Sequence, residues 1–395
     1  MTDPWESFVA RAPTADVAGY FEATAAGDRS ALASWFSGDA DVRTLDRRTD
    51  PEVLENDAER FLARNPRGGI VGYVGFDAVG LFEPALATFP AGSPFPLGEL
   101  AFVDRLPRRS VVVRPRRSLP PGRPRRPDGD SMPRPRFERA VRRLIGEIRN
   151  GEAFQVVLAH RRAWRRPDDL LARADALRAS ERYSFFYYLK FGDRELVGAT
   201  PESVVEMRRG RGYLNPIAGT LPVAPRRTRL PLPRDPKELA EHRMLVDLAR
   251  NDLGRVAEPG SVRVLVAERH ERYARLAHLV SVVGGRLRPA IGPLDLLAAT
   301  FPAGTVSGAP KIRATQLLRR EEGTWRGPYG GAVGCVRPGG RADWALLIRS
   351  AFAAGDRMYT AAGAGIVHRS QPAQEFDETL AKLDHLEAAM TGAVP

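Results

Sequence analysis

Two pairs of glutamates with the same spacing stand out in this sequence, because such pairs could bind a metal ion. Glu238 and Glu241 lie in KELAEHRMLVDLARND, and Glu375 and Glu378 lie in EFDETLAKLDHLEAAM. In a helix, a spacing of three residues places both carboxylates on one face. If two such helices met, the four carboxylates would repel one another unless a hard cation lay between them. Oxygen ligands without a cysteine or a histidine pair favour Mg²⁺, so a magnesium site is one interpretation of these pairs.

Both pairs could equally have a purely structural role. Asp235 has the properties of an N-cap, and Glu238 falls where a capping box places its acid. Glu378 could pair with Lys382 on a solvated helix face. Glu241 fits such a role less well, because steps of three and four residues from it follow the apolar stripe of its helix. A carboxylate that faces the interior needs a partner, and the neighbouring sequence offers no obvious cation.

Two glycine-rich segments could bind an anionic substrate. FPAGTVSGAPKIRA (301–314) places Thr305 before a helix expected to start near Pro310, and backbone N–H groups at a helix N-terminus bind carboxylate or phosphate. AAGAGIV (361–367) is expected to be a second such loop. Arg349, expected in a strand, could hold a carboxylate through two hydrogen bonds. The plainer alternatives are an ordinary turn and a surface charge, and neither segment has the spacing of a P-loop or a Rossmann fingerprint.

These side chains need a scaffold that brings distant segments together. Strand-like segments come in runs and do not alternate strictly with helices, which favours an α+β fold of antiparallel sheets wrapped by helices over a doubly wound fold. The expected strands include residues 153–164, 185–191, 195–207, 210–220 and 260–273. The expected helices include residues 137–151, 236–252, 311–321 and 375–390. We divide the chain into an N-terminal region (1–113), an Arg/Pro-rich linker or loop (114–136) and a catalytic region (137–395).

The composition of the chain is strongly basic. Sixty Lys and Arg stand against 48 Asp and Glu, and the formal net charge is +12. Nucleic-acid-binding proteins share this property. However, many of the arginines gather in residues 114–136, and no zinc knuckle, recognition helix or interleaved aromatic residues accompany them. We therefore expect no nucleic-acid partner. The same charge would steer small dianions toward the protein.

The sequence also bears on the cellular compartment. Cys335 is the single cysteine, so disulfides and thiolate metal clusters within the chain are excluded. The first residues lack the basic start and apolar run of a signal peptide. No apolar stretch approaches the roughly 18 residues of a membrane span. We expect a cytoplasmic protein with no membrane partner.

A series of longer motifs carries a resemblance to a known family. These motifs are GGIVGYVGFD (68–77), PIAGT (216–220), KELAEHRMLVDLARNDLGR (237–255), AHLVSVVGG (277–285), FPAGTVSGAPKIRA (301–314), RGPYGGAVG (326–334), LLIRSAF (346–352), AGAGIV (362–367) and the Glu-x-x-Glu of 375–378. With them the chain resembles the chorismate-utilising enzymes, and most closely anthranilate synthase component I. The resemblance covers about residues 137–390 and implies the chorismate-binding enzyme fold, with antiparallel sheets.

The resemblance implies a reaction on chorismate, a small dicarboxylate enol ether. Mg²⁺ would bridge the ring carboxylate and the two glutamate pairs, which are Glu238 with Glu241 and Glu375 with Glu378. Ammonia would add to the ring as the hydroxyl leaves, and pyruvate would then be eliminated.

The resemblance also implies catalytic and substrate-binding residues. Glu202, in ATPES, matches the general acid for the departing hydroxyl, and such an acid needs a raised pKa, which desolvation could supply. His278 matches the histidine linked to pyruvate elimination, although a lone histidine without this motif would be interpreted as structural. Thr305 completes the implied catalytic set. The residues that match contacts to the substrate carboxylates are Thr220, Thr305, Tyr329, Arg349, Gly363, Ala364 and Gly365.

Three positions favour anthranilate as the product. Gln155 stands where members that use water carry a lysine base, and glutamine cannot act as a base. Ala218 replaces the lysine of the PIKGT motif of aminodeoxychorismate synthases, and AGTVSGAPK departs from their usual GGS-[IV]-TGAPK. The implied function is that of an anthranilate synthase large subunit, which converts chorismate and ammonia to anthranilate and pyruvate in tryptophan biosynthesis.

Two alternatives stay open. One is aminodeoxychorismate synthase component I of the folate pathway, because some of these enzymes lack that lysine. The other is a basic nucleic-acid-binding protein, in which the acid pairs would have no purpose. Either enzyme would take ammonia from a separate glutamine amidotransferase subunit in a hetero-oligomer. The chain cannot supply that activity itself, because its lone Cys335 is expected in a strand.

Overall fold

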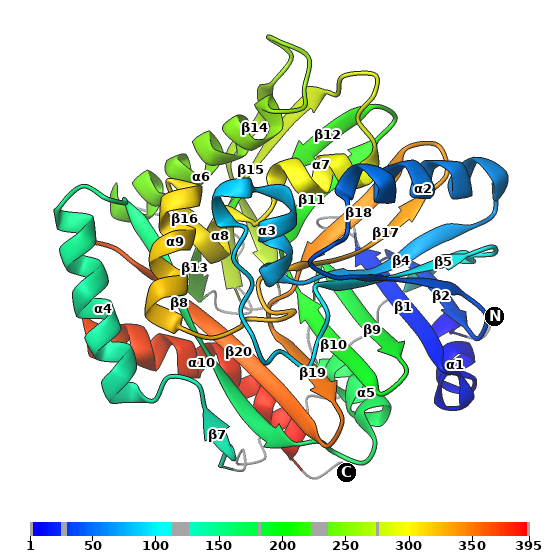
Figure 1. Ribbon diagram of the computed structural model, residues 1–395, viewed down its shortest axis with the longest axis horizontal. Coiled ribbons are helices and arrows are strands. Elements are labelled where there is room, and N and C mark those ends of the chain that lie inside the picture. Colours follow the sequence, from blue (N-terminus) through cyan, green and yellow to red (C-terminus); the bar gives the residue numbers. More distant parts are fainter. Residues whose placement is uncertain are drawn as a thin grey trace.

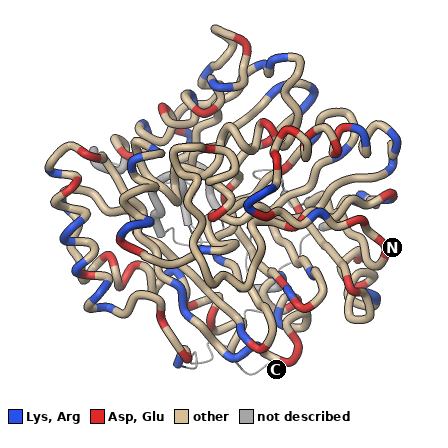
Figure 2. Tube along the Cα trace, in the orientation of Figure 1, with Lys and Arg blue, Asp and Glu red and all other residues tan. Residues whose placement is uncertain are grey.

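The computed structural model of the chain describes residues 3–24, 30–112, 126–180, 183–222, 236–273 and 276–392. Within these residues two antiparallel sheets pack face to face, and helices cover their outer faces and ends (Figure 1). The α+β expectation is therefore confirmed. No helix among the described residues is both long and apolar enough to span a membrane. Acidic and basic residues are interspersed along most of the trace (Figure 2).

The first sheet has ten strands within the described part of the chain. In spatial order they are β16 (Gly308–Ala309), β8 (Gln155–Arg165), β20 (Arg357–Ile366), β19 (Ser350–Ala354), β10 (Arg194–Thr200), β9 (Phe185–Phe191), β1 (Val17–Thr24), β2 (Ser30–Ser37) and β6 (Arg108–Val112), with β7 (Gly129–Asp130) paired to β8.

The second sheet also has ten strands among the described residues. They follow the order β13 (Ile217–Pro222), β15 (Leu276–Arg286), β12 (Arg211–Leu214), β11 (Ser203–Arg208), β18 (Arg341–Leu346), β17 (Ala332–Arg337), β4 (Gly69–Val74), β5 (Gly98–Val103) and β3 (Asp41–Leu45), with β14 (Arg263–Tyr273) paired to β15. Strands from the first 112 residues belong to both sheets. The proposed division of the chain into three regions stays a prediction.

A hydrophobic layer fills the space between the sheets. Val71 and Tyr73 of β4 face Tyr187 and Leu189 of β9 within one buried cluster. Alternate residues of these strands point into the layer, as period-2 side-chain alternation requires. Burial of such large side chains stabilises the fold by roughly 1.5–3 kcal/mol each.

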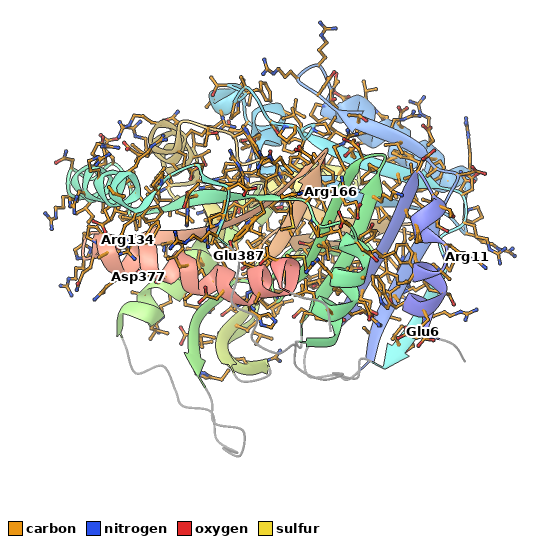
Figure 3. The ribbon with its side chains drawn as sticks, turned by 90° about the horizontal axis from the view of Figure 1, so that it is seen from below. Glu6, Arg11, Arg134, Arg166, Asp377 and Glu387 are labelled. Carbon is orange, nitrogen blue, oxygen red and sulfur yellow. The ribbon has the colours of Figure 1, made fainter. Side chains whose placement is uncertain are left out.

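Helices cover the remaining apolar faces. Shorter elements are α1 (Pro4–Val9), α3 (Val79–Phe82), α8 (Gly304–Ser307), η1 (Ala12–Thr14), η2 (Phe76–Ala78) and η3 (Pro84–Leu86). The longer helices are α2 (Pro51–Arg64), α4 (Arg134–Arg149), α5 (Leu170–Ser180), α6 (Pro236–Gly254), α7 (Pro293–Thr300), α9 (Lys311–Glu322) and α10 (Pro372–Thr391). Figure 1 shows α6, α7 and α2 along one side of the molecule, with α10 and α5 on the other. Figure 3 shows Arg134 and Asp377 next to each other where α4 and α10 pack together, and these two side chains form an ion pair.

Two expected strands are wrong in their extent, because a proline interrupts each of them. Residues 195–207 form β10 in the first sheet and β11 in the second, and the chain crosses between the sheets at Pro201 and Glu202. Residues 210–220 form β12 and β13, with Pro216 between them. Proline has no N–H to donate to a strand ladder, so a central strand ends there. The crossing at Glu202 exposes that side chain to the space where the sheets diverge.

The expected loop at 361–367 is also wrong. Residues 361–366 lie inside β20, where Gly363 pairs with Ala159 and Gly365 with Val157 of β8. A Cβ on Gly365 would lie 2.6 Å from Nε2 of Gln155, so the glycine leaves room for that side chain. The small residues here permit close side-chain approach to a strand and do not form an anion-binding loop.

A buried ion pair links α6 to the start of α9. Nζ of Lys311 lies 2.8 Å from Oδ2 of Asp252 and also donates to the carbonyl of Thr300 at 2.8 Å. Burial raises the pKa of the Asp252 carboxyl and lowers the pKa of the Lys311 amine, while their mutual attraction opposes both shifts.

Lys311→Met is expected to lower the free energy of unfolding by about 3–5 kcal/mol, because it leaves a buried carboxylate without its cation. Urea denaturation of the variant measures this loss. The double variant Lys311→Met/Asp252→Leu is expected to recover most of the stability. A single variant as stable as the parent protein would contradict the prediction.

Candidate active site

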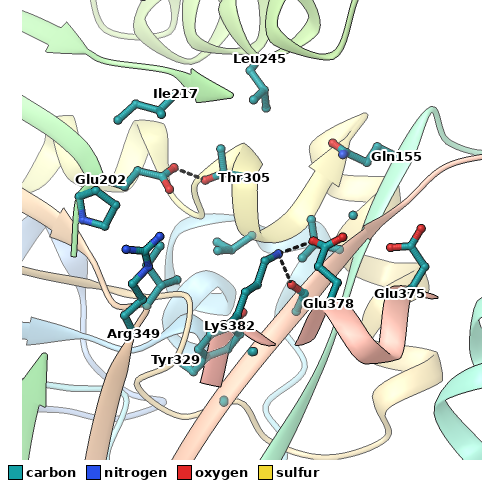
Figure 4. A pocket seen from close by; sticks show the side chains of 18 of the residues that line it. Gln155, Glu202, Ile217, Leu245, Thr305, Tyr329, Arg349, Glu375, Glu378 and Lys382 are labelled. Atoms are coloured by element: carbon teal, nitrogen blue, oxygen red, sulfur yellow. Dashed lines mark hydrogen bonds and ion pairs between the residues drawn. The ribbon is translucent and has the colours of Figure 1, made fainter. Parts of the chain in front are cut away.

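A cavity of about 350 Å³ opens where the two sheets diverge, a size typical of small-molecule sites. Both sheets and three helices supply its walls, and Figure 4 shows the side chains from close by. The residues that line it include Gln155, Glu202, Glu241, Thr305, Tyr329, Arg349, Gly363, Glu375, Glu378 and Lys382. Segments as far apart in the sequence as 155 and 382 therefore meet at one site.

Three of the four glutamates of the acid pairs line this cavity. Glu241 comes from α6, and Glu375 and Glu378 come from the first turns of α10. Nε2 of Gln155 donates to Oε1 of Glu241 at 2.7 Å, which gives that carboxylate the partner that the neighbouring sequence lacks. Among the described residues, no three carboxylate, imidazole or thiolate groups lie close enough together to hold a metal ion.

Glu378 also makes the ion pair with Lys382 that helical spacing predicts. Nζ of Lys382 lies 2.7 Å from Oε1 of Glu378 and donates to the carbonyl of Gly363 at 2.8 Å (Figure 4). The pair does not lie on a face turned away from the site, because both residues line the cavity. Lys382 is therefore a cation of the site that sequence reasoning placed only in a surface ion pair.

The acid side chain at the crossing between the sheets is held by a hydroxyl. Oγ1 of Thr305 donates to Oε1 of Glu202 at 2.5 Å. Burial raises the pKa of the Glu202 carboxyl to about 7, although the Thr305 hydrogen bond and the positive charges of Arg349 and Lys382 pull it down. A carboxyl with this pKa holds its proton part of the time near neutral pH, as a general acid must.

Thr305 occupies a different local structure from the one expected. The sequence predicts a loop that ends at a helix near Pro310. The expected helix is present as α9, which begins at Lys311, but residues 304–307 form the short helix α8 and Gly308 pairs with Val156 of β8. The hydroxyl of Thr305, and not a long helix N-terminus, therefore faces the cavity.

Basic and phenolic groups lie across the cavity from the carboxylates. Arg349 lies in the bend between β18 and β19 with φ 51°, so the expectation that it lies in a strand is wrong. Strand β18 ends at Leu346, and the left-handed backbone at Arg349 turns the chain before β19 while the side chain lines the cavity. Tyr329 is buried, and burial raises the pKa of its phenol, so it stays a neutral hydrogen-bond donor.

The glycines of β20 shape the same wall. A Cβ on Gly363 would meet the hydroxyl of Tyr329 at 3.1 Å. Gly363 and Gly365 line the cavity, whereas the side chain of Ala364 points to the other face of the strand and lies in the hydrophobic core. Ala364 could therefore reach a ligand only through its backbone.

Three predicted site residues can be placed only by their backbone. Thr220 lies in β13, Glu238 in α6 and His278 in β15, and their side chains lie outside the described part of the structure. The side chain of Ala218, also in β13, likewise lies outside the described part of the structure. The functional assignments of these residues stay predictions.

His242, next to the first acid pair, has a structural position. Its ring is fully buried, and Nε2 lies 2.7 Å from Oγ of Ser281 in β15. Burial lowers the pKa of the imidazole, so it is neutral. The ring packs α6 against the second sheet on the side away from the cavity, which leaves Glu241 on the cavity side.

Two further side chains position the site and were missed from the sequence. Nε2 of the buried His160 lies 2.9 Å from Oγ1 of Thr379, and its Nδ1 lies 3.0 Å from Asp130. This contact ties α10 to β8 directly behind Glu378. An interior polar residue in an apolar strand is a signal for such a contact, but its partner cannot be read from the sequence.

Arg326 is the second of these missed residues. Its buried guanidinium forms two hydrogen bonds to Glu322, of 2.6 and 2.8 Å. It also donates to the carbonyls of Val306 at 2.6 Å and Val157 at 2.7 Å, both of which line the cavity. One side chain thus fixes β8 relative to α8, next to Thr305.

The chain belongs to the chorismate binding enzyme family, whose sequence pattern matches residues 18–388. Within that family it is similar to anthranilate synthase component 1 of Methanothermobacter thermautotrophicus, with 39% identity over 82% of this chain and 75% of that protein. It is also 39% identical to anthranilate synthase component 1 of Streptomyces coelicolor, over 83% of this chain and 73% of that protein.

Solved structures agree with this placement. Anthranilate synthase component I from Streptococcus pneumoniae superimposes with a TM-score of 0.77 at 29% identity, over 92% of this chain and 93% of that one. The menaquinone-specific isochorismate synthase of Escherichia coli gives the same TM-score of 0.77 at 20% identity, over 99% of this chain and 92% of that one. At this lower identity the likeness concerns the fold alone.

Proposed function

We propose that the chain is the large subunit of an anthranilate synthase, which converts chorismate and ammonia to anthranilate and pyruvate in tryptophan biosynthesis. One observation carries the proposal. In a chain of this family, the carboxylates of α6 and α10 line the same cavity as Glu202, the buried phenol of Tyr329 and Arg349. The carboxyl of Glu202 has a pKa of about 7, so it is partly protonated near neutral pH. This arrangement suits a substrate that has two carboxylates and a hydroxyl that must leave.

The residues divide into two roles. Arg349 and Lys382 supply positive charge, and Tyr329 a hydroxyl, for the carboxylates of chorismate. Glu202 gives its proton to the departing ring hydroxyl, which leaves as water, and Thr305 holds the carboxyl in place. Removal of water from the cavity strengthens each of these interactions. His278 would serve the elimination of pyruvate.

The oxygen donors at this cavity are of the type that Mg²⁺ prefers, although the described carboxylates do not by themselves gather closely enough to hold an ion. Glu241, Glu375 and Glu378 bring three carboxylates to the cavity, and among its described lining residues Arg349 and Lys382 are the cations, so a dianionic substrate needs further positive charge there. Glu238, one turn before Glu241, would be the fourth ligand. When bound, Mg²⁺ would neutralise the ring carboxylate and orient it, as carboxylate-bound magnesium does in other sites.

A separate glutamine amidotransferase subunit would supply the ammonia. Hydrolysis of glutamine in such subunits needs a reactive nucleophile, and Cys335 is buried in β17 with the pKa of its thiol raised by burial. A thiol of this kind is inert. The proposed assembly is therefore a hetero-oligomer in which this chain carries the chorismate site.

The direct test is fluorescence of the purified chain with chorismate, Mg²⁺ and a high ammonium concentration at mildly basic pH. We expect an anthranilate signal that disappears when EDTA replaces Mg²⁺. Consumption of chorismate without anthranilate would contradict the proposal, and mass spectrometry of the product would then test for aminodeoxychorismate. Failure to consume chorismate, both alone and with an amidotransferase subunit added, would contradict chorismate chemistry altogether.

The pKa of Glu202 predicts a pH dependence. The carboxyl must be protonated to act as an acid, and the protonated fraction falls as the pH rises through about 7. With the concentration of free NH₃ held constant, kcat/KM for chorismate is expected to fall roughly tenfold per pH unit above that value. A profile that stays flat from pH 6 to 9 would contradict the assignment of Glu202 as the acid.

A further inference from the structure

A second cavity lies outside the candidate active site and is lined mainly by arginine. It measures about 360 Å³ and forms where the start of β4, the link from β5 to β6 and the β17–β18 hairpin meet. Its lining residues are Pro66, Arg67, Gly68, Arg105, Leu106, Pro107, Arg108, Arg337, Pro338 and Arg341. None of them lines the candidate active site. We call these residues the arginine groove.

The groove concentrates positive charge, and none of its described lining residues is acidic. Its lining holds five arginines. Among the described residues, no carboxylate forms an ion pair with Arg67, Arg105, Arg108 or Arg341. Asp343, which lies nearby on β18, is already paired with Arg208 of β11. Elsewhere on the chain arginines commonly have acidic partners, as Arg142 has Glu138.

The strand register forces these like charges together. Arg337 is directly opposite Arg341 in the β17–β18 hairpin, and Arg341 is directly opposite Arg208 in the β11–β18 pair. Like charges at directly opposite positions destabilise a sheet. Burial lowers the pKa of Arg108, and the charge of Arg337 lowers it further; the charge of Asp343 opposes this shift, and Arg341 and Arg208 add smaller repulsions. A bound anion would relieve this repulsion.

Prolines flank several arginines of the groove. Pro66 precedes Arg67, Pro107 precedes Arg108, and Pro338 follows Arg337. Proline fixes its backbone φ angle and so restricts the backbone beside these arginines. Arg337 is held in addition by Ser34 and by the carbonyl of Leu106.

We propose that the arginine groove binds a small anion with two or more phosphate groups. Guanidinium groups match phosphate oxygens in pairs of hydrogen bonds and keep their charge at any physiological pH. A single monoanion would leave most of the five charges uncompensated, whereas a di- or triphosphate would compensate more of them. A free nucleoside di- or triphosphate and an inorganic polyphosphate both carry such linked phosphate groups.

Isothermal titration of the full chain with inorganic triphosphate tests the proposal. We expect saturable binding of one molecule per chain that weakens as the salt concentration rises. The variant Arg337→Gln/Arg341→Gln is expected to bind at least tenfold more weakly. The control variant Arg142→Gln/Arg250→Gln removes the same charge from exposed helix positions and is expected to bind like the parent protein.

Two further measurements test whether binding belongs to the groove and not to the active site or to the overall positive charge. The groove variant should turn over chorismate at the parent rate and melt at the same or a higher temperature, because repulsion is removed. Titration with ATP in place of triphosphate shows whether a nucleoside is tolerated. No saturable binding, equal loss of affinity in both variants, or binding of a DNA oligonucleotide but not of triphosphate would each overturn the proposal.

Discussion

Glu241→Gln and Glu378→Gln are each expected to abolish chorismate turnover while the fold stays intact. Both carboxylates line the cavity, from α6 and α10, and each would lose a negative charge that the proposed Mg²⁺ requires. Loss of several kcal/mol of charge stabilisation corresponds to a fall in kcat/KM on the order of 10³-fold or more. Glutamine keeps the size of the side chain and can still accept hydrogen bonds.

The same two helices provide matched controls. Asp247→Asn on α6 and Asp377→Asn on α10 also remove one carboxylate each, but both side chains are exposed and pair with arginines away from the cavity. These variants are expected to keep nearly full activity. Calorimetry measures the binding of Mg²⁺ in the presence of chorismate. Of the four variants, only Glu241→Gln and Glu378→Gln should lose this binding. Full activity in either of those variants would refute the metal assignment.

Glu202→Gln is expected to lower kcat by roughly 10²–10⁴-fold, the usual contribution of a positioned general acid. The amide can keep a hydrogen bond with Thr305 but has no proton to transfer to the departing hydroxyl. The variant should bind chorismate with little change in affinity. The fall of activity above pH 7 should also disappear, because the group that titrates is gone.

Thr305→Val provides an independent check on the same carboxyl. The Thr305 hydroxyl lowers the pKa of Glu202 by donating a hydrogen bond to its carboxylate form. Without that bond the pKa rises, so the descending limb of the pH profile should move to higher pH. A variant in which the limb stays in place would show that another group controls the profile.

Several features followed from local sequence alone. The helix over residues 236–252 and the helix over residues 375–390 are both present, and the apolar stripe does carry Glu241 to an interior site. Helical periodicity depends only on neighbouring residues, so these helices could be predicted without knowing the contacts made by the rest of the chain. The family motifs placed the chain among the chorismate binding enzymes, and the sequence match over residues 18–388 bears that out.

Other features depended on packing between distant segments. The sequence could not show that residues 195–207 change from one sheet to the other, or that the strand over residues 357–366 lies between β8 and β19. A run of apolar and small residues fits a strand or a loop equally well, and register is fixed only by partners elsewhere in the chain. The carboxyl of Glu202, where the chain crosses between the sheets, has a raised pKa because this packing buries it.

The sequence by itself determined which groups were present: two acid pairs on helices, a single thiol, an excess of arginine and the motifs of the family. Only the tertiary structure decided which of them meet. It placed the carbonyl of Gly363 next to Lys382, gave Glu241 a partner in Gln155, and aligned Arg337 with Arg341 across a hairpin. Electrostatic interactions act through space and fall off with distance, so those between segments far apart in the sequence cannot be predicted from chain position.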